Sequence, residues 1–376
     1  MAPSALFIFV SVVLAPHVLA QSTLDFPATP LNQLSYPHPT DAPYQIYPPT
    51  GARYTRGPQT GYNICNSTTE GQSSMCQTMY INGLDDLCLW GPATANSLIA
   101  NTEGEVIAHC AKTGYGTRIM QSGLVKGAQL LKTSEYWMIT GIIDQTLINI
   151  QAGDNGGELD SGGQDGRGNP IGGLVYSTAW AKDNLPTQIQ WWTEFIGNNQ
   201  FCIKICNPDG KNEAGYCQHT LDRIGLGYNC PSKYTIDGGN IAEGDFEVCD
   251  SNLMTVPGIY VENGQTMSYE QPPEALGQIA TIPYLPVAVA SSNCQKFTSS
   301  ALYTQMVTPT ATSSASSSSA SSTGGHTITS RTATATAASA MNTSANRSSS
   351  AMTMSSIFLP VIVAVAGVVG SMALLA

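Results

Sequence analysis

The sequence predicts a mainly β domain of the α+β type, with few short helices, an antiparallel sheet system and disulfide cross-links. Short runs of β-branched and aromatic residues, bounded by Gly, Asp and Ser, fill the middle of the chain. Ten cysteines lie between residues 65 and 294, and a Ser/Thr-rich tail without cysteine follows them. We therefore expect one cross-linked globular domain over residues 61–300.

The first sixty residues predict a leader and an arm. Residues 5–14, ALFIFVSVVL, are apolar but too few to span a bilayer, and VLA at 18–20 supplies the small residue that precedes a signal-peptidase cut. Residues 1–20 are therefore predicted to be a signal peptide. Residues 21–60 carry eight prolines, which remove backbone donors and fix φ. We expect this stretch to run extended over the main domain.

The globular part predicts strands first and helices later. Strands are expected over 105–111, 124–132, 136–143, 147–151 and 173–178. Residues 186–199, PTQIQWWTEFIGNN, place apolar side chains at helical spacing after a proline, which predicts a helix. FCIKIC (201–206) alternates like an edge strand, and a second short helix is expected over 214–224.

The C-terminal residues predict a stalk and an attachment signal. Residues 301–350 are rich in Ser, Thr and Ala and cannot bury enough apolar surface to fold, so we expect a disordered, O-glycosylated stalk. Residues 357–376 are apolar, and no Lys or Arg follows them. Residues 351–376 are therefore predicted to be a glycosylphosphatidylinositol (GPI) attachment signal, with a transmembrane segment as the alternative; Ser344, Asn346 and Ser348 are the candidate attachment residues.

Cysteine number and overall charge bound the chemistry. The cysteines are even in number and belong to a chain with a predicted signal peptide, so we expect up to five disulfides, some of them closed within 202–249. The residues are Cys65, Cys76, Cys88, Cys110, Cys202, Cys206, Cys217, Cys230, Cys249 and Cys294. No C-x2-C pair occurs, which argues against zinc. The net charge of −11 argues against nucleic acid and anionic lipid as partners. Sequons predict N-glycans at Asn66, Asn342 and Asn346.

An acidic, glycine-rich loop carries the candidate site residues. Asp154, Glu158, Asp160 and Asp165 lie within twelve residues. Their oxygens could bind Ca²⁺, Glu158 and Asp160 could act as a glycosidase pair, or the loop could be structural. No other cofactor is expected.

The Asp-Ser-Gly-Gly segment at 160–163 does not predict a serine protease. His109 is too close in sequence to Ser161 for a two-barrel protease, and Leu159 stands where the oxyanion loop needs glycine. We therefore predict no catalytic residue. His219 and Asp222 are expected to form a local pair on one helix face. Trp90, Trp191 and Tyr216 could stack on sugars, and of Trp191 and its neighbour Trp192 one is expected in the core.

Four segments resemble one protein family. They are HCAKTGYGTR (109–118), residues 127–176 with GDNGGELDSGGQDGRGNPIGGLVY at their end, FCIKIC and CQHTLDRIGLGYNCP (217–231). They resemble the fungal secreted proteins called macrophage activating glycoprotein, many of which share a signal peptide, stalk and hydrophobic tail. The resemblance names no reaction and implies no catalytic residue.

The expected function is that of a non-enzymatic, GPI-tethered fungal surface glycoprotein that binds glycan or protein ligands at the cell wall. Its contact with the membrane would be the anchor or a C-terminal helix. The alternative is a secreted hydrolase of wall polysaccharide that uses the carboxylates of the 154–165 loop.

Overall fold

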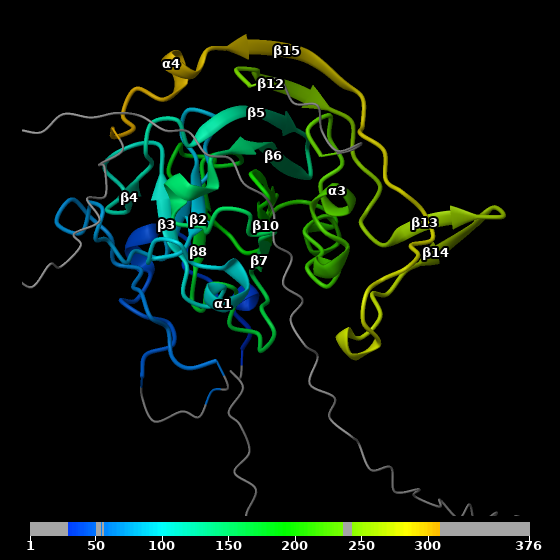
Figure 1. The fold of residues 1–376 in the computed structure, drawn as a ribbon, viewed down its shortest axis with the longest axis horizontal. Coiled ribbons are helices and arrows are strands. Elements are labelled where there is room, and N and C mark those ends of the chain that lie inside the picture. The colour runs from blue at the N-terminus through cyan, green and yellow to red at the C-terminus, as the bar shows by residue number, and fades with distance from the viewer. Residues whose placement is uncertain (1–28, 50–53, 55, 236–242, 309–376) are drawn as a thin grey trace, which may run out of the picture. The chain divides into compact units, whose positions relative to one another are not determined.

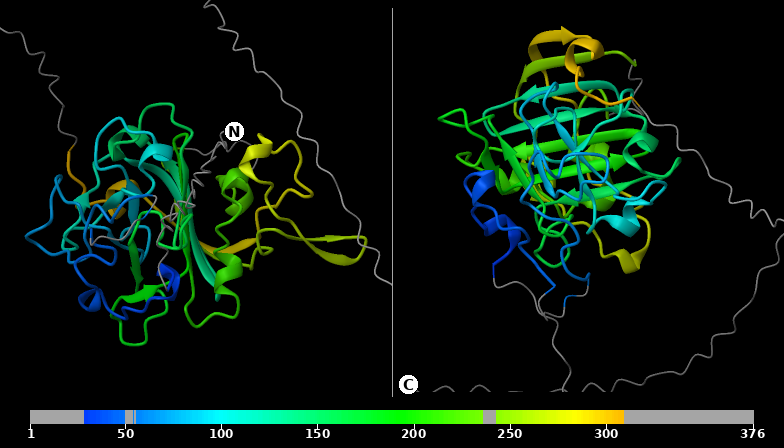
Figure 2. Two further views of the ribbon diagram at one scale, coloured as in Figure 1. Left: turned by 90° about the horizontal axis from the view of Figure 1, so that it is seen from below. Right: turned by 90° about the vertical axis from the view of Figure 1, so that its left-hand side faces the viewer.

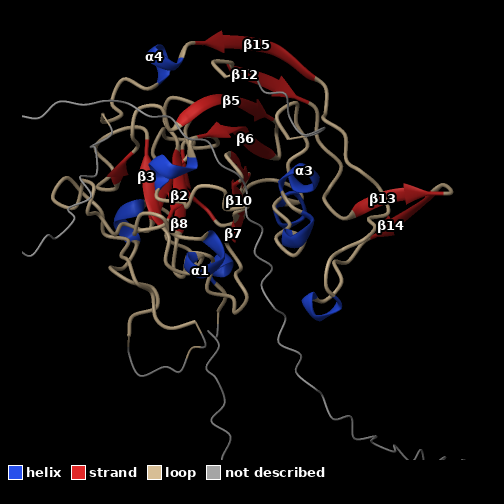
Figure 3. Cartoon of the chain, viewed as in Figure 1, coloured by secondary structure: helices blue, strands red, loops and turns tan. Residues whose placement is uncertain are grey.

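The computed structural model describes residues 29–49, 54, 56–235 and 243–308. Strands dominate this part of the chain, and the helices are single turns (Figures 1 and 3). The predicted signal peptide, the C-terminal hydrophobic segment and stalk residues 309–350 lie outside the described residues. The prediction of a mainly β domain with short helices and disulfides is confirmed.

The largest sheet has seven strands in the order β15-β12-β5-β6-β11-β10-β7. All neighbours are antiparallel except β12 and β5, which are parallel. The strands are β5 (Val125–Lys132), β6 (Tyr136–Ile143), β7 (Gly157–Asp160), β10 (Trp192–Gly197), β11 (Gln200–Cys206), β12 (Phe246–Ser251) and β15 (Ser291–Phe297).

The described part also contains three smaller sheets, four short α-helices and five 3-10 turns. The strands are β1 (Thr78–Tyr80), β8 (Leu174–Ser177) and β9 (Thr187–Ile189) in one sheet, β2 (Cys88–Gly91), β3 (Ile107–Cys110) and β4 (Arg118–Ile119) in another, and β13 (Ile259–Glu262) with β14 (Gln265–Ser268) in a hairpin. The helices are α1 (Ile99–Thr102), α2 (Glu213–Tyr216), α3 (Leu226–Asn229) and α4 (Ser299–Leu302).

The seven-stranded sheet separates two apolar clusters. The main core lies on one face and includes Ile139, Trp192 and Ile203, all at most 1 % exposed. The other face packs against the segment that follows β11, where Met138 and Phe195 meet cysteines and Met254. The left view of Figure 2 shows the sheet edge-on, with one part of the chain on each side of it. Because β11 is covered on both faces, its polar side chains are buried too.

Five disulfides pair all ten cysteines: Cys65–Cys76, Cys88–Cys110, Cys202–Cys230, Cys206–Cys217 and Cys249–Cys294. Two of them close within 202–249, as expected, and both attach the segment after β11 to that strand. The cross-links therefore hold a part of the chain that has little regular structure of its own.

The predicted helix over 186–199 is wrong, because these residues form β9 and β10. Asn198 and Asn199 have positive φ angles of 49° and 57°, which makes a two-residue hairpin turn between β10 and β11. The apolar spacing also fits a strand in which Trp192 and Ile196 face the main core. The turn therefore decides the structure, and the helical period is coincidental.

Three further element predictions need correction. FCIKIC is a strand, but β11 lies between β6 and β10, so it is central rather than an edge. The helix expected over 214–224 is interrupted: only α2 and a 3-10 turn at Asp222–Ile224 form, with Cys217 bonded to Cys206 between them. Residues 147–151 begin in a 3-10 turn, Gln145–Ile148, rather than a strand.

The described chain stays folded beyond residue 300. Leu302 on α4 is 8 % exposed, and Val307 pairs with Gln121. Residues 301–308, which composition assigns to the stalk, thus contact the domain. On the N-terminal side, Leu31 and Tyr47 of the proline-rich arm are buried in the main core.

Candidate functional site

The four carboxylates of the acidic loop have separate roles. Asp154 accepts hydrogen bonds from the backbone N–H of Ile99 (2.8 Å) and Gly156 (3.2 Å), so it braces a turn. Asp165 pairs with Arg56 and Arg167, both at 2.7 Å. Burial alone would raise the pKa of Asp165, but the two guanidinium groups outweigh it and lower the pKa. These two carboxylates stabilise the loop.

Glu158 and Asp160 share one face of β7. Asp160 Oδ1 accepts from the backbone N–H of Gly162 (2.6 Å) and Gly163 (2.7 Å), and His219 Nδ1 lies 3.2 Å away. Burial raises the pKa of Glu158 well above its usual value, and the charge and hydrogen bond of Asp160 add to the effect. Glu158 therefore ionises less readily than an ordinary glutamate, and it lies beside an anchored Asp160.

Calcium binding by the four carboxylates stays a prediction. Among the described residues, the one compact group of three metal-ligating side chains is Glu247, Cys249 and Cys294, and its cysteines form a disulfide. Glu158 and Asp160 alone of the four lie on one strand face. No third carboxylate of the loop completes a cation site with them.

Lys204 lies two strands away on the same buried face. The register places Asp160, Thr193 and Lys204 in one row across β7, β10 and β11. Lys204 is fully buried, and its Nζ donates to the carbonyl of Asn229 at 2.8 Å. Burial lowers the pKa of Lys204 to about 7, although the charge of Glu158 opposes the effect. Asp160 and Lys204 thus lie on one buried face, on either side of Thr193, and the segment after β11 covers this face.

The protease interpretation of Ser161 also fails on geometry. Ser161 Oγ is buried and has no hydrogen-bond partner among the described residues, and neither has His109 Nε2. The imidazole near this loop is that of His219, and a Cβ on Gly162 would collide with it. The expected helical pair of His219 and Asp222 is wrong, because His219 contacts Asp160 and Asp222 accepts from Gln271 instead.

Glu103, whose pKa is raised in part by Asp160, gives the stability of the protein a measurable pH dependence. Burial and, second, the charge of Asp160 raise the pKa of Glu103 to about 7. Because the pKa of Glu103 is higher in the folded protein than in the unfolded chain, this carboxyl group contributes stability that is fully present below about pH 4.5. The contribution is lost as the pH rises through 7. We expect Glu103→Gln to reduce the fall in unfolding free energy between pH 5 and 8 by about 1–2 kcal/mol, allowing for solvent screening. Urea unfolding at both pH values measures this, with exposed Glu105→Gln as the control; equal pH dependence in both variants would contradict it.

A groove of about 430 Å³ lies on another part of the domain. Four segments form its walls: the arm at residues 35–38, the loop between β8 and β9, residues 187–190 in and directly after β9, and the turn after β11. The lining residues are Ser35, Pro37, His38, Trp180, Ala181, Lys182, Asp183, Thr187, Gln188, Gln190, Asn207, Pro208 and Asp209. The groove combines an aromatic side chain, Trp180, with several hydrogen-bonding groups.

Trp180 forms the aromatic wall of the groove, and Trp137 packs against its ring. Its ring lies 5.8 Å from that of Trp137, centroid to centroid, and Lys132 Nζ lies 4.5 Å above Trp137. The side chain of Trp180 is partly exposed. Its ring is therefore accessible for a ligand to stack on.

The polar walls of the groove are set by hydrogen bonds to the arm. The side-chain amides of Gln188 and Gln190 both donate to the carbonyl of Leu34 at 3.1 Å. Asn207 donates to the carbonyl of Ser134 at 2.8 Å, and its Oδ1 accepts from Asp209 N at 3.0 Å. These contacts fix the amide groups before any ligand binds, which lowers the entropy cost of binding.

The aromatic residues named from the sequence lie elsewhere. Trp90 is fully buried and packs on Trp192, so it cannot stack on a sugar. Trp191 is partly exposed whereas Trp192 is in the core, as expected for that pair. Tyr216 packs on Tyr136 at 5.2 Å. Sequence reasoning missed Trp180, and its one local signal was an aromatic residue in a loop rich in polar residues.

The predicted modification sites are only partly within the described residues. Asn66 is exposed, and its side-chain oxygen accepts from Thr68 Oγ1 at 2.6 Å within the sequon. Asn342, Ser344, Asn346 and Ser348 lie outside the described residues. In the described part of the chain, no helix is long and apolar enough to cross a membrane.

The chain is similar to two curated proteins of the fungus Mycosarcoma maydis. It is 40 % identical to appressorium protein ROW1 over 216 residues, which are 57 % of this chain and 48 % of ROW1. It is 36 % identical to appressorium protein ROW2 over 248 residues, 65 % of this chain and 79 % of ROW2. The chain therefore spans about half the length of the first relative and most of the second. No protein-family model and no solved structure matches it.

Proposed function

This chain belongs to the family of the appressorium proteins ROW1 and ROW2, and from that premise we propose that it is a non-enzymatic protein of the fungal cell surface that binds a cell-wall glycan in the Trp180 groove. The observation that carries the proposal is the groove itself, with an aromatic ring on one wall and fixed amides on the others. Sugar sites combine these two elements, because the apolar face of a pyranose packs on a ring while its hydroxyls need hydrogen-bond partners.

The charge of the protein favours a neutral glycan. The chain carries −11 at neutral pH, so anionic polymers are repelled at long range. The groove contains Lys182, but its Nζ is paired with Asp209 at 3.0 Å. A neutral glycan needs no charge partner and no cofactor, and the carboxylates of Asp183 and Asp209 beside the single Lys182 of the lining also disfavour an anion.

Display at the surface completes the proposal. A cleaved leader, N-glycans at Asn66, Asn342 and Asn346, an O-glycosylated stalk and a GPI anchor near 344–348 would hold the domain at the wall. This layout also agrees with the resemblance to the macrophage activating glycoproteins. Release of the protein from fungal cells by phosphatidylinositol-specific phospholipase C would support the GPI anchor over a transmembrane helix.

Substitution of Trp180 tests the groove. We expect wild-type protein to bind at least one soluble wall oligosaccharide, from chitin, β-glucan or mannan, and Trp180→Ala to weaken that binding at least tenfold, or about 1.4 kcal/mol. Tyr44→Ala is the matched control, because Tyr44 is an exposed aromatic (56 %) that does not line the groove. Calorimetric titration measures both, and recovery of intact oligosaccharide checks that no hydrolysis occurs. No binding to any wall glycan, or equal loss in both variants, would contradict the proposal.

A further inference from the structure

A second, smaller pocket of about 200 Å³ lies beside β3 and β4, and its lining shares no residue with the Trp180 groove. Its lining is Gln72, His109, Arg118, Gln121, Asn149, Val307 and Thr308. Pockets for drug-sized ligands are larger, so this one suits a ligand no bigger than a monosaccharide. None of the lining side chains is acidic.

Arg118 is a buried cation without a carboxylate. It is 8 % exposed, and its Nε and Nη1 donate to the carbonyls of Ser74 (3.0 Å) and Ala93 (2.8 Å). Within the described residues it forms no ion pair, and Nη2 has no hydrogen-bond partner. Burial lowers its pKa. A buried charge is costly unless it is paired, so the free edge of this guanidinium is suited to an anion.

His109 lies beside Arg118 in register on the neighbouring parallel strand. It is 3 % exposed, and its Nε2 has no partner among the described residues. Burial, and second the charge of Arg118, lower the pKa of His109 to about 3, so the imidazole is neutral. The carbonyl of Pro92 hydrogen-bonds the ring. If this bond uses the Nδ1 proton, Nε2 offers a lone pair to a hydroxyl donor.

The amides around the pocket also present acceptors. Each amide NH2 group already donates a hydrogen bond to a backbone carbonyl: Gln72 to Ile119 (2.8 Å), Gln121 to Leu147 (3.1 Å) and Asn149 to Pro92 (2.9 Å). Their amide oxygens have no hydrogen-bond partners in the described part of the chain. The pocket thus joins one cationic donor to several neutral acceptors.

From this pattern we propose that the pocket binds a small hydroxylated carboxylate, such as a uronic acid or a hydroxy acid. The carboxylate pairs with Nη2 of Arg118, and the hydroxyls donate to His109 Nε2 and the amide oxygens. A neutral sugar leaves the guanidinium unpaired, and an anion without hydroxyls leaves the acceptors unpaired. Both are therefore expected to bind more weakly.

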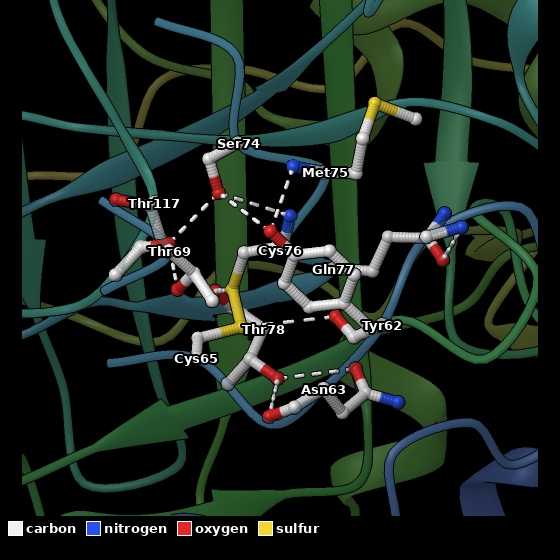
Figure 4. The surroundings of a disulfide bond; sticks show 12 residues. Tyr62, Asn63, Cys65, Thr69, Ser74, Met75, Cys76, Gln77, Thr78 and Thr117 are labelled. Atoms are coloured by element: carbon white, nitrogen blue, oxygen red, sulfur yellow. Dashed lines mark hydrogen bonds between the residues drawn. A yellow bond between two sulfur atoms is a disulfide. The ribbon is translucent and has the colours of Figure 1, made fainter. Parts of the chain in front are cut away.

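The Cys65–Cys76 disulfide holds one side of this pocket. Ser74, whose carbonyl binds Arg118, lies in the loop that the disulfide closes, and its hydroxyl accepts from Cys76 N at 3.2 Å and donates to the carbonyl of Gly116 at 2.8 Å (Figure 4). Gln72 belongs to the same loop. The guanidinium is therefore fixed before a ligand arrives.

Binding of defined probes tests the proposal on the full chain purified from a fungal host. D-glucuronate and lactate represent a uronic acid and a free hydroxy acid, with glucose as the neutral counterpart and acetate as a carboxylate without hydroxyls. We expect saturable binding of glucuronate or lactate by ligand-observed NMR and calorimetry, at least tenfold tighter than glucose or acetate. Which of the two acids binds more tightly identifies the source of the ligand.

Three variants connect that binding to the pocket. Arg118→Gln and Thr308→Trp are each expected to weaken it at least tenfold; the second fills the pocket without touching the hydrogen bonds of Arg118, so it remains informative if the first misfolds. Lys182→Gln removes a cation from the Trp180 groove and should leave acid binding unchanged, as should Trp180→Ala. Absence of binding in the wild type, acetate binding as tightly as the hydroxylated acids, or full binding in Thr308→Trp would overturn the proposal.

Discussion

Removal of the Cys202–Cys230 disulfide by serine at both positions is expected to lower the free energy of unfolding by about 3.5 kcal/mol. This disulfide closes a loop of 28 residues and attaches the segment after β11 to the central strand. A cross-link of this length restricts the unfolded chain by about that amount. The covering segment has only short helical turns, so few other contacts can replace the bond.

Urea unfolding of the variant and wild type measures the change. The Cys206–Cys217 disulfide is the matched control, because it holds the same segment on the same strand but closes 11 residues. Its removal should cost about 0.8 kcal/mol less, from the logarithmic dependence on loop length. A loss below 1 kcal/mol for the Cys202–Cys230 variant would show that the covering segment is held mainly by other contacts.

Lys204→Met is expected to stabilise the protein at pH 6, by roughly 2–4 kcal/mol. Lys204 is fully buried, and one backbone carbonyl is its close oxygen partner. Its pKa falls from 10.5 to about 7 through burial. At pH 6 the fold therefore contains a charged ammonium group in a buried layer, next to Met254. A methionine of similar length removes that charge and keeps the packing.

The pH dependence of this effect has a defined sign. Between pH 7 and 10.5 the unfolded chain holds a proton on Lys204 that the fold has released, so wild-type stability rises with pH by up to about 1.4 kcal/mol per unit. The advantage of the Met variant should therefore shrink from pH 6 toward pH 10. Lys126→Met, at a partly exposed lysine, is the control and should show little change. A Lys204→Met protein that is less stable at every pH would contradict this account.

Local patterns predicted the sheet where the signal is strong. Residues 124–143 are β-branched and aromatic with clear turns, and they form β5 and β6 close to the expected bounds. Residues 186–199 fit both periods, and the deciding feature is the Asn198-Asn199 turn, whose positive φ angles join β10 to β11. Asparagine tolerates positive φ angles, so Asn198-Asn199 can follow a helix or form a hairpin turn, and the sequence alone did not separate the two.

The site was less predictable because it is assembled across the fold. Glu158 and Asp160 are two residues apart, so their shared face follows once β7 is a strand. Lys204 and His219 join them only through strand order and the disulfide-held segment. In the groove, residues 35–38 of the arm lie close to Trp180 and Asn207. No spacing in the sequence indicates that these segments come together.

Hydrogen–deuterium exchange with a bound wall oligosaccharide tests the central claim most directly. If the groove is the glycan site, backbone amides in the loop at residues 178–187 and in the arm at residues 35–38 should exchange more slowly when the oligosaccharide is present. Amides in the β13–β14 hairpin should be unaffected. Protection confined to other parts of the domain, with the loop and the arm unchanged, would contradict the account.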